Sequence, residues 1–279
     1  MYRLGVAAMI AATAAWSPSG DVIVSGPAAE LARAPYMPAA VEERDWQWRG
    51  RVEQGDAIEI KGVNGEIEAE PASGQEVEVR ARLSGKRSDP DEVEMVVIEH
   101  SGGVTICALY PSTRRDEPNE CLPGTEGRNN VKNNDVKVRF SVRVPSGVNF
   151  VGRTVNGGVQ ALGLGGDVRV GTVNGDVDVS ANGLVEASTV NGSITATMGR
   201  ADWRGVLDFS TVNGSVTIEM PDEVNADVSI STVNGHITSD YPLTVDGRFS
   251  PRHVKGTIGN GGRALVVKTV NGSVQLRKS

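Results

Sequence analysis

The sequence predicts an all-β protein built as a parallel β-solenoid, and three observations support this. The tetrapeptide TVNG, or the shorter VNG, returns along the chain, with its asparagines at Asn64, Asn156, Asn174, Asn191, Asn213, Asn234 and Asn271. Between these motifs apolar and polar residues alternate, as in GDVDVS and GSVTIEM, and this alternation is the period of a β-strand. Glycine accounts for 34 of the 279 residues, well above its usual share, as expected for a chain with many turns.

The spacing of the motifs predicts the size of one coil. From Asn156 onward the steps between successive asparagines are 18, 17, 22, 21 and 37 residues. The segment HVKGTI at His253–Ile258 aligns with TVNGSI, which divides the last step into 21 and 16 and puts Lys255 in place of the asparagine. Apolar positions from Val159 to Ile194 recur at intervals of 9, 9, 8 and 9. Each coil of about 18–22 residues is therefore expected to hold two strands and one TVNG corner.

A series of β-hairpins is the alternative, because an Asn-Gly pair between alternating segments is also a strong hairpin signal. The solenoid is favoured because the same turn returns at a nearly constant step. Valine would then stack on valine, and asparagine on asparagine, with hydrogen bonds between the stacked amides. We expect Asn and Gly to supply the positive φ of a tight corner. The predicted corner residues are Asn64, Gly65, Asn156, Gly157, Asn174, Gly175, Asn191, Gly192, Asn213, Gly214, Asn234, Gly235, Asn271 and Gly272.

The first half of the chain has longer alternating segments. Asn64 and Asn156 are 92 positions apart, and the region between them contains EVEVRARLSG, VEMVVIEH and VKVRFSVRV. We expect residues 45–150 to form wider coils or a sheet that caps the repeat solenoid of residues 151–279, because an open end would expose unpaired strand edges. Trp46 and Trp48 alternate, so they are expected to share an apolar face over the first coil.

The combination of these segments resembles the bacterial putative-adhesin domain family of unknown function, which comprises secreted β-solenoid proteins with TVNG-type repeats. The resemblance spans about Asp45 to Lys278. It implies a right-handed β-helix-like fold and an exported location, and it brings no catalytic residues. It is carried by DWQWRG at Asp45, IEIKGVNGEIEAEP at Ile58, VTICALYP at Val104, FSVRVPSGVNF at Phe140, the TVNG series and SDYPL at Ser239.

The N-terminus predicts export to the periplasm or the outside of the cell. Arg3 precedes an apolar run from Leu4 to Ala15 that ends in small residues, which is typical of a signal peptide of residues 1–15. The run is too short to span a bilayer, and we expect no transmembrane segment in the mature chain. Residues 16–44 are expected to be a disordered linker.

The two cysteines agree with export. Cys107 and Cys121 are 14 positions apart and flank a polar stretch. A disulfide between them would close this loop and contribute about 3 kcal/mol to stability. A metal or redox pair is the alternative, but a pair with this spacing and no neighbouring histidine supports it poorly.

Composition argues against two classes of partner. The formal net charge is -7 and no long basic run is present. Binding to nucleic acid or to an anionic membrane surface depends on clustered Lys and Arg, so neither is expected.

Candidate catalytic and metal-binding residues are scattered. None of the histidines His100, His236 and His253 lies near a GxSxG motif, so the sequence does not indicate a nucleophilic triad. A calcium site needs several oxygen ligands, and Asp176, as a single aspartate after a corner, could not form one alone. A polysaccharide-degrading β-helix enzyme would need two convergent carboxylates. Its candidates would be Asp202, Asp208, Asp222, Glu223 and Asp240. We expect no enzyme activity, metal or cofactor.

A binding role is the favoured function. The two longer coils contain the insertions MGRADWRG and MPDEVNAD. Trp203, flanked by Asp202 and Arg204, could stack on a sugar ring or anchor a partner, although its ring could equally fold back on the solenoid. The sequence therefore favours a non-catalytic protein that binds a polysaccharide or a protein surface at the cell envelope. The alternatives are a structural or self-assembling envelope element and, less favoured, the polysaccharide-degrading enzyme.

Overall fold

The computed structural model describes residues 42–112, 114, 116–245 and 252–279. The chain divides into two compact units, Met1–Pro38 and Ala39–Ser279, and all the described elements belong to the second. The predicted signal peptide of residues 1–15 and most of the predicted linker of residues 16–44 lie outside the described residues. Strand β1 begins at Glu42, which is inside the predicted linker.

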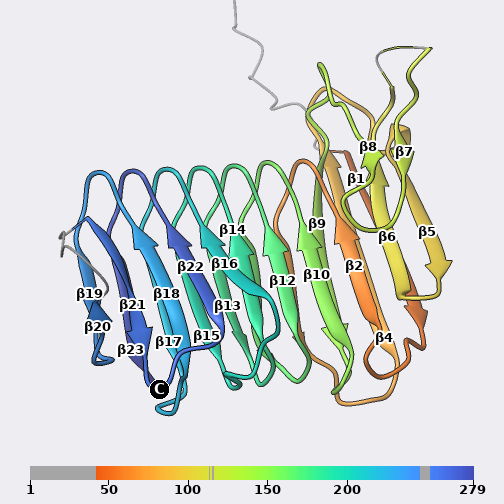
Figure 1. Cartoon of the computed structure of the whole chain (residues 1–279). Helices are drawn as coiled ribbons and strands as arrows, with labels where there is room; N and C mark the ends of the chain where they lie inside the picture. The colour runs from red at the N-terminus through yellow and green to blue at the C-terminus, as the bar shows by residue number, and fades with distance from the viewer. Residues whose placement is uncertain (1–41, 113, 115, 246–251) are drawn as a thin grey trace, which may run out of the picture. The chain divides into compact units, whose positions relative to one another are not determined.

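Two large sheets, A and B, hold most of the described strands and form the two faces of the solenoid (Figure 1). In spatial order, sheet A contains β1 (Glu42–Gly50), β4 (Val77–Gly85), β9 (Lys137–Val144), β3 (Ile67–Pro71), β11 (Val159–Leu164), β13 (Val177–Ala181), β15 (Ile194–Met198), β17 (Val216–Met220), β23 (Val274–Lys278) and β19 (Ile237–Ser239). Sheet B contains β5 (Glu94–His100), β6 (Gly103–Leu109), β2 (Ala57–Lys61), β10 (Asn149–Arg153), β12 (Val168–Gly171), β14 (Val185–Ser188), β16 (Val206–Ser210), β22 (Ala264–Lys268), β18 (Ala226–Ser231), β21 (His253–Ile258) and β20 (Thr244–Val245).

Three small elements of the described chain lie outside the large sheets. Strands β7 (Glu120–Cys121) and β8 (Gly127–Arg128) pair with each other, and η1 is a 3-10 helix at Pro90–Glu92. None of the helices in the described part of the chain is long and apolar enough to cross a membrane.

One coil consists of a strand in sheet B, a TVNG corner and a strand in sheet A, which confirms the predicted parallel solenoid with two strands per coil. Side chains alternate between the core and the outer face because successive residues of a strand point to opposite sides. In sheet A the first core position of each coil is stacked in register on the next. The stacked residues are Ile67, Val159, Val177, Ile194, Val216 and Val274.

The coils are not stacked in sequence order at the C-terminal end. Strand β22 lies between β16 and β18, and β23 lies between β17 and β19, as Figure 1 shows for β22. The coil with Asn271 is therefore inserted between the coils with Asn213 and Asn234.

The interpretation of HVKGTI as a repeat with Lys255 at its corner is wrong. This segment is β21, which pairs antiparallel with β18 and places Lys255 opposite Ser229. Its alternating residues suit any strand, and it lacks the Asn-Gly pair that turns the other coils.

Of the two arrangements expected for the N-terminal region, wider coils or a capping sheet, the structure has additional antiparallel strands at the end of both sheets. Strands β1 and β4 extend sheet A by antiparallel pairing, and β5 does the same beside β6 in sheet B. Trp46 and Trp48 are half-buried against the core, as expected. Strand β9 marks the junction, because it is antiparallel to β4 and parallel to β3. The repeats and the cap are continuous, since β2 and β3 belong to the same sheets as residues 151–279.

Candidate functional site

The corner asparagines form one continuous ladder of hydrogen bonds. From Asn156 onward, each Nδ2 donates to the Oδ1 of an asparagine in a neighbouring coil, and these residues are exposed to solvent. The distances are 2.8 Å (Asn156 to Asn64), 2.9 Å (Asn174 to Asn156), 2.8 Å (Asn191 to Asn174), 2.7 Å (Asn213 to Asn191), 2.7 Å (Asn271 to Asn213) and 2.8 Å (Asn234 to Asn271). The expected stacking of asparagine on asparagine is confirmed.

The threonines of the motif form a second ladder on the buried side of the corner. Each Oγ1 donates to the carbonyl oxygen of the glycine in the neighbouring coil. The distances are 3.0 Å (Thr154 to Gly65), 2.8 Å (Thr172 to Gly157), 3.0 Å (Thr189 to Gly175), 2.8 Å (Thr211 to Gly192), 2.8 Å (Thr269 to Gly214) and 2.8 Å (Thr232 to Gly272). A buried hydroxyl would be costly without such a partner.

The expected positive φ at Asn and Gly is wrong for most corners. Among the described residues Asn133 is the non-glycine residue with positive φ, and of the corner glycines Gly65 (131°) and Gly214 (158°) have it. Glycine is needed instead because the coils approach closely. A Cβ would lie 1.9–2.3 Å from the glycine carbonyl oxygen of the next coil at Gly157, Gly175, Gly192, Gly214, Gly235 and Gly272.

The TVNG repeat is therefore an architectural motif, since the polar side chains of its threonine and asparagine are used between coils. The valine of the motif remains on the surface in the repeats, at 37–53 % exposure in Val155, Val173, Val190, Val212, Val233 and Val270. His236, which follows one corner, is also exposed.

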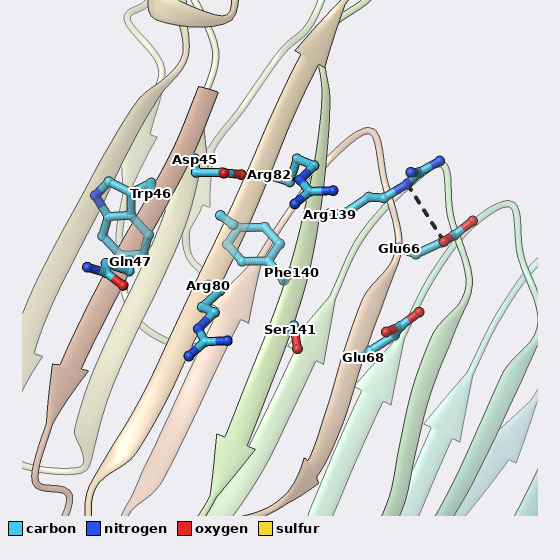
Figure 2. A pocket seen from close by; sticks show the side chains of 11 residues that line it. Asp45, Trp46, Gln47, Glu66, Glu68, Arg80, Arg82, Arg139, Phe140 and Ser141 are labelled. Carbon is cyan, nitrogen blue, oxygen red and sulfur yellow. Dashed lines mark hydrogen bonds and ion pairs between the residues drawn. The ribbon is translucent and has the colours of Figure 1, made fainter. Parts of the chain in front are cut away.

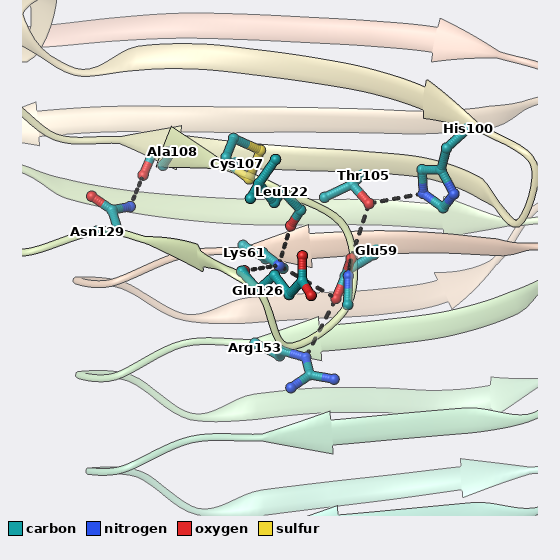
Figure 3. The surroundings of a disulfide bond; sticks show 12 residues. Glu59, Lys61, His100, Thr105, Cys107, Ala108, Leu122, Glu126, Asn129 and Arg153 are labelled. Carbon is teal, nitrogen blue, oxygen red and sulfur yellow. Dashed lines mark hydrogen bonds and ion pairs between the residues drawn. A yellow bond between two sulfur atoms is a disulfide. The ribbon is translucent and has the colours of Figure 1, made fainter. Parts of the chain in front are cut away.

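The disulfide between Cys107 and Cys121 is present, as predicted, and joins β6 to β7 with the two Cα atoms 5.9 Å apart (Figure 3). The residues that directly follow Cys121, which we include in the disulfide loop, are held by side chains from sheet B. The Lys61 Nζ donates to the carbonyl oxygens of Leu122 and, at 3.0 Å, Glu126. Burial lowers the pKa of Lys61, and the nearby carboxylate of Glu59 partly offsets this effect.

Glu59 is a buried carboxylate, 5 % exposed, at the centre of this arrangement. Its Oε2 accepts hydrogen bonds from Thr105 Oγ1 and from the backbone nitrogen of Gly124, each at 2.9 Å. Its Oε1 lies 3.4 Å from the Nε of Arg153 and 3.9 Å from the Nζ of Lys61. Figure 3 shows both cations beside Glu59. One carboxylate thus links β2, β6, β10 and the disulfide loop.

Trp203 is buried, at 3 % exposure, and its Nε1 donates to the carbonyl oxygen of Ala264 at 2.9 Å. Its ring face is therefore not available for stacking on a ligand in this structure, and the ring folds back on the solenoid instead. Asp202 is exposed and pairs with Arg200 at 2.9 Å, which holds the pKa of Asp202 below its usual value. Arg204 is exposed on the same insertion.

The candidate catalytic acids lie on different elements of the fold. Asp208 lies on the outer face of sheet B, Asp222 and Glu223 lie in the connection after β17, and Asp240 accepts from the backbone nitrogen of Lys278. No cluster of three or more His, Cys, Asp or Glu side chains that could hold a metal ion occurs among the described residues.

A hollow of about 660 Å³ lies on the outer face of sheet A, at the junction between the cap and the repeats (Figure 2). Strands β1, β4, β9 and β3 contribute its lining, which we call the sheet A hollow. The lining residues are Asp45, Trp46, Gln47, Glu66, Glu68, Arg80, Ala81, Arg82, Arg139, Phe140 and Ser141.

Four charged side chains form a row across this hollow. Arg82 and Arg139 are directly opposite each other on β4 and β9, an arrangement that like charges normally disfavour. Each arginine has an acidic neighbour on the side away from the other arginine. Arg82 Nε lies 3.2 Å from Asp45 Oδ1, and Arg139 Nε lies 4.0 Å from Glu66 Oε2. Figure 2 shows the guanidinium groups and carboxylates beside one another on neighbouring strands.

A second row runs parallel to the first and is less charged. Arg80 is opposite Gln47 on one side and opposite Ser141 on the other, and Ser141 is in register with Glu68. The two rows together present both hydrogen-bond donors and acceptors on a rigid sheet.

Sheet B has two smaller hollows, of about 330 and 300 Å³, which share Arg169 and Glu186. These two side chains pair at 2.8 Å between β12 and β14. Thr125 of the disulfide loop borders the first hollow, whereas Trp203 and Arg204 border the second.

Sequence reasoning did not identify the sheet A hollow. Its polar residues occupy ordinary outward positions on strands that are far apart along the chain. The available signal is that the arginines of VRARL are two positions apart and those of VRFSVRV are four positions apart, which predicts cations on one face of each strand.

The repeat region is the part of the chain that matches a known family model. Residues 153–277 match a family model described as Toastrack DUF4097, and no protein of curated function matches the chain. The structure is similar to a putative cell adhesion protein from Clostridium sporogenes, with a TM-score of 0.43, 9 % identity and coverage of 85 % of this chain and 100 % of that one. It is also similar to a putative adhesin from Bacteroides fragilis, with a TM-score of 0.32, 13 % identity and coverage of 85 % and 97 %.

The matched residues contain the corners from Asn156 to Asn271 and begin within β10. The corner at Asn64 lies before the match, although it belongs to the same asparagine ladder. The resemblance to a domain family of unknown function is confirmed. Residues 153–277 of this chain are similar to the Toastrack DUF4097 family.

Proposed function

We propose that this protein is an exported, non-catalytic binding protein of the cell envelope and that the sheet A hollow holds a polysaccharide. The observation that carries the proposal is the double row of polar side chains in a hollow of about 660 Å³. Sugar hydroxyls both donate and accept hydrogen bonds, so they match a surface on which arginines alternate with carboxylates, an amide and a hydroxyl.

The strands make this surface rigid. Arg82 and Arg139 each face a carboxylate, at 3.2 Å in Asp45 and at 4.0 Å in Glu66, and the paired backbones of their strands set the spacing of the two rows. The Cys107–Cys121 disulfide supports export, because such bonds persist in oxidising compartments.

A pull-down with the full chain tests this function. The protein is incubated with insoluble peptidoglycan, chitin and cellulose, and the supernatant is assayed for released reducing ends. Retention on one polysaccharide without released ends is the expected result. Release of sugar ends would replace the binding role with an enzymatic one, and absence of retention on all three would argue for a protein partner or a structural role.

A further inference from the structure

The C-terminal coil, which we define as β22, the corner Thr269–Gly272 and β23, occupies a slot between two coils that precede it in the chain. In sheet B, β22 pairs with β16 on one side and with β18 on the other. In sheet A, β23 is likewise between β17 and β19. All four pairings are parallel and in register.

The contacts on the two sides of the slot are those of every other coil. Asn271 donates to Asn213 at 2.7 Å and accepts from Asn234 at 2.8 Å. The threonine and glycine ladders also pass through the coil without a break. The slot is therefore a complete binding site for one TVNG coil, and the rest of the chain forms both of its walls.

The order of the coils has a consequence for assembly. Both walls of the slot, residues 206–220 and 226–239, are synthesised before the C-terminal coil. The slot must be open when the coil enters it. An open slot accepts a coil of this sequence by the same hydrogen bonds whether that coil comes from its own chain or from another.

The connection that leads into the coil is suited to act as a hinge. Residues 259–263, GNGGR, join β21 to β22 and include three glycines with positive φ: Gly259 at 59°, Gly261 at 70° and Gly262 at 99°. Glycine permits such angles and many others at little steric cost. A change in the direction of this connection would move the coil away from its slot while leaving its own strands unchanged.

We propose that the C-terminal coil exchanges between two copies of this chain, so that β22 and β23 of one copy fill the slot of the second. Exchange replaces each intramolecular contact by an identical intermolecular one, which is why such swapping is a low-cost route to dimers. The partner is a second copy of this chain, and the interaction would place two sheet A hollows in one assembly.

A mixture of two variants of the full chain, each with one added cysteine, tests the exchange directly. Thr217→Cys and Gln275→Cys occupy positions that are paired in register on the outer face of sheet A. The two variants are unfolded and refolded together without reductant, treated with a short bismaleimide and analysed by intact mass. A crosslinked heterodimer of the two variants forms efficiently only when the coil of one chain lies in the slot of the other.

A matched control uses Thr195→Cys mixed with Thr217→Cys, which are also in register but belong to coils that follow each other in the chain. We expect a several-fold larger heterodimer yield for the first mixture than for the control. A second pair on sheet B, Asp208→Cys with Val266→Cys, repeats the measurement if the first pair does not fold. Yields equal to the control for the folded pairs would overturn the proposal.

Discussion

The side-chain nitrogen of Asn174 donates to the Oδ1 of Asn156 at 2.9 Å, although the two residues are 18 positions apart. The same bond is repeated from coil to coil, so an interior asparagine both donates and accepts. Asn234, at the end of the ladder, donates to Asn271. The contribution of an asparagine to the free energy of unfolding should therefore depend on its place in the stack.

Replacement of an interior asparagine is expected to cost more than replacement of the terminal one. Asn191→Ala removes two side-chain hydrogen bonds, and we expect a loss of about 1–2 kcal/mol in the free energy of unfolding. Asn234→Ala removes one, with an expected loss of about 0.5–1 kcal/mol. Urea unfolding of both variants measures the difference. Equal losses would show that the ladder does not act through paired amides.

The close approach of the corner glycines predicts a larger loss of stability for their replacement than for that of the asparagines. A Cβ at Gly192 would lie 2.0 Å from the carbonyl oxygen of Gly175, so Gly192→Ala must separate two coils. We expect a loss of at least about 4 kcal/mol, or failure to fold, because backbone cannot move away from backbone cheaply. Gly74→Ala is the control, since nothing lies within 4 Å of the position that a Cβ would take there, and unfolding in urea should show little change. Similar stability of the two variants would refute the close-packing argument.

Removal of the buried carboxylate should loosen the disulfide loop. Glu59→Ala leaves Lys61 and Arg153 without their anion and takes the acceptor from Thr105. We expect a loss of about 3 kcal/mol in unfolding free energy, because the buried Thr105 hydroxyl and the backbone nitrogen of Gly124 lose the acceptor that they share, together with faster proteolysis within residues 108–128. The control is Glu70→Ala, whose exposed ion pair with Arg143 at 2.9 Å should contribute less than about 1 kcal/mol. If both variants were equally stable and protease-resistant, Glu59 would not hold the loop.

Tyr110 predicts a specific loss of stability in alkali. Burial raises the pKa of its phenol from 10.0 to about 12, and its hydroxyl donates to the carbonyl oxygen of Val136 at 2.8 Å. The neutral phenol is favoured in the folded state, so this contribution is complete below pH 10 and is lost as the pH rises from 10 to 12. The loss is at most about 2–3 kcal/mol.

The comparison with Tyr110→Phe isolates this effect from other alkaline changes. Urea unfolding of both proteins is measured between pH 9 and pH 12. The stability difference between wild type and variant should shrink across this range. A constant difference would show that Tyr110 does not titrate as its burial implies.

The repeats allowed the architecture to be predicted because stacked coils impose the same residues at the same place. Thr, Asn and Gly each serve a contact between neighbouring coils, so the motif and its spacing carry the fold. The cap and the disulfide could also be predicted, from the longer alternating segments and from the spacing of Cys107 and Cys121.

The order of the last coils and the hollow could not be predicted, for related reasons. TVNGSV occurs at Thr211 and again at Thr269, and identical corners can stack in any order without a change in local contacts. The hollow depends on which strands are neighbours, because Arg82 and Arg139 are brought together by the pairing of β4 with β9. The sequence left open whether Trp203 stacks on a ligand or folds back on the solenoid, because its partner Ala264 belongs to the inserted coil, which the sequence order conceals.

The most direct test of the proposed binding role is the retention of hollow variants on the polysaccharide panel. Arg80→Ala/Arg139→Ala removes one cation from each row of the sheet A hollow, while Arg169→Ala/Arg204→Ala removes two from the hollows of sheet B. We expect the sheet A variant to lose at least about tenfold in affinity, or about 1.4 kcal/mol, for the polysaccharide that retains the wild type. The sheet B variant should bind as the wild type does. Undiminished retention of the sheet A variant, or a loss confined to the sheet B variant, would contradict the account.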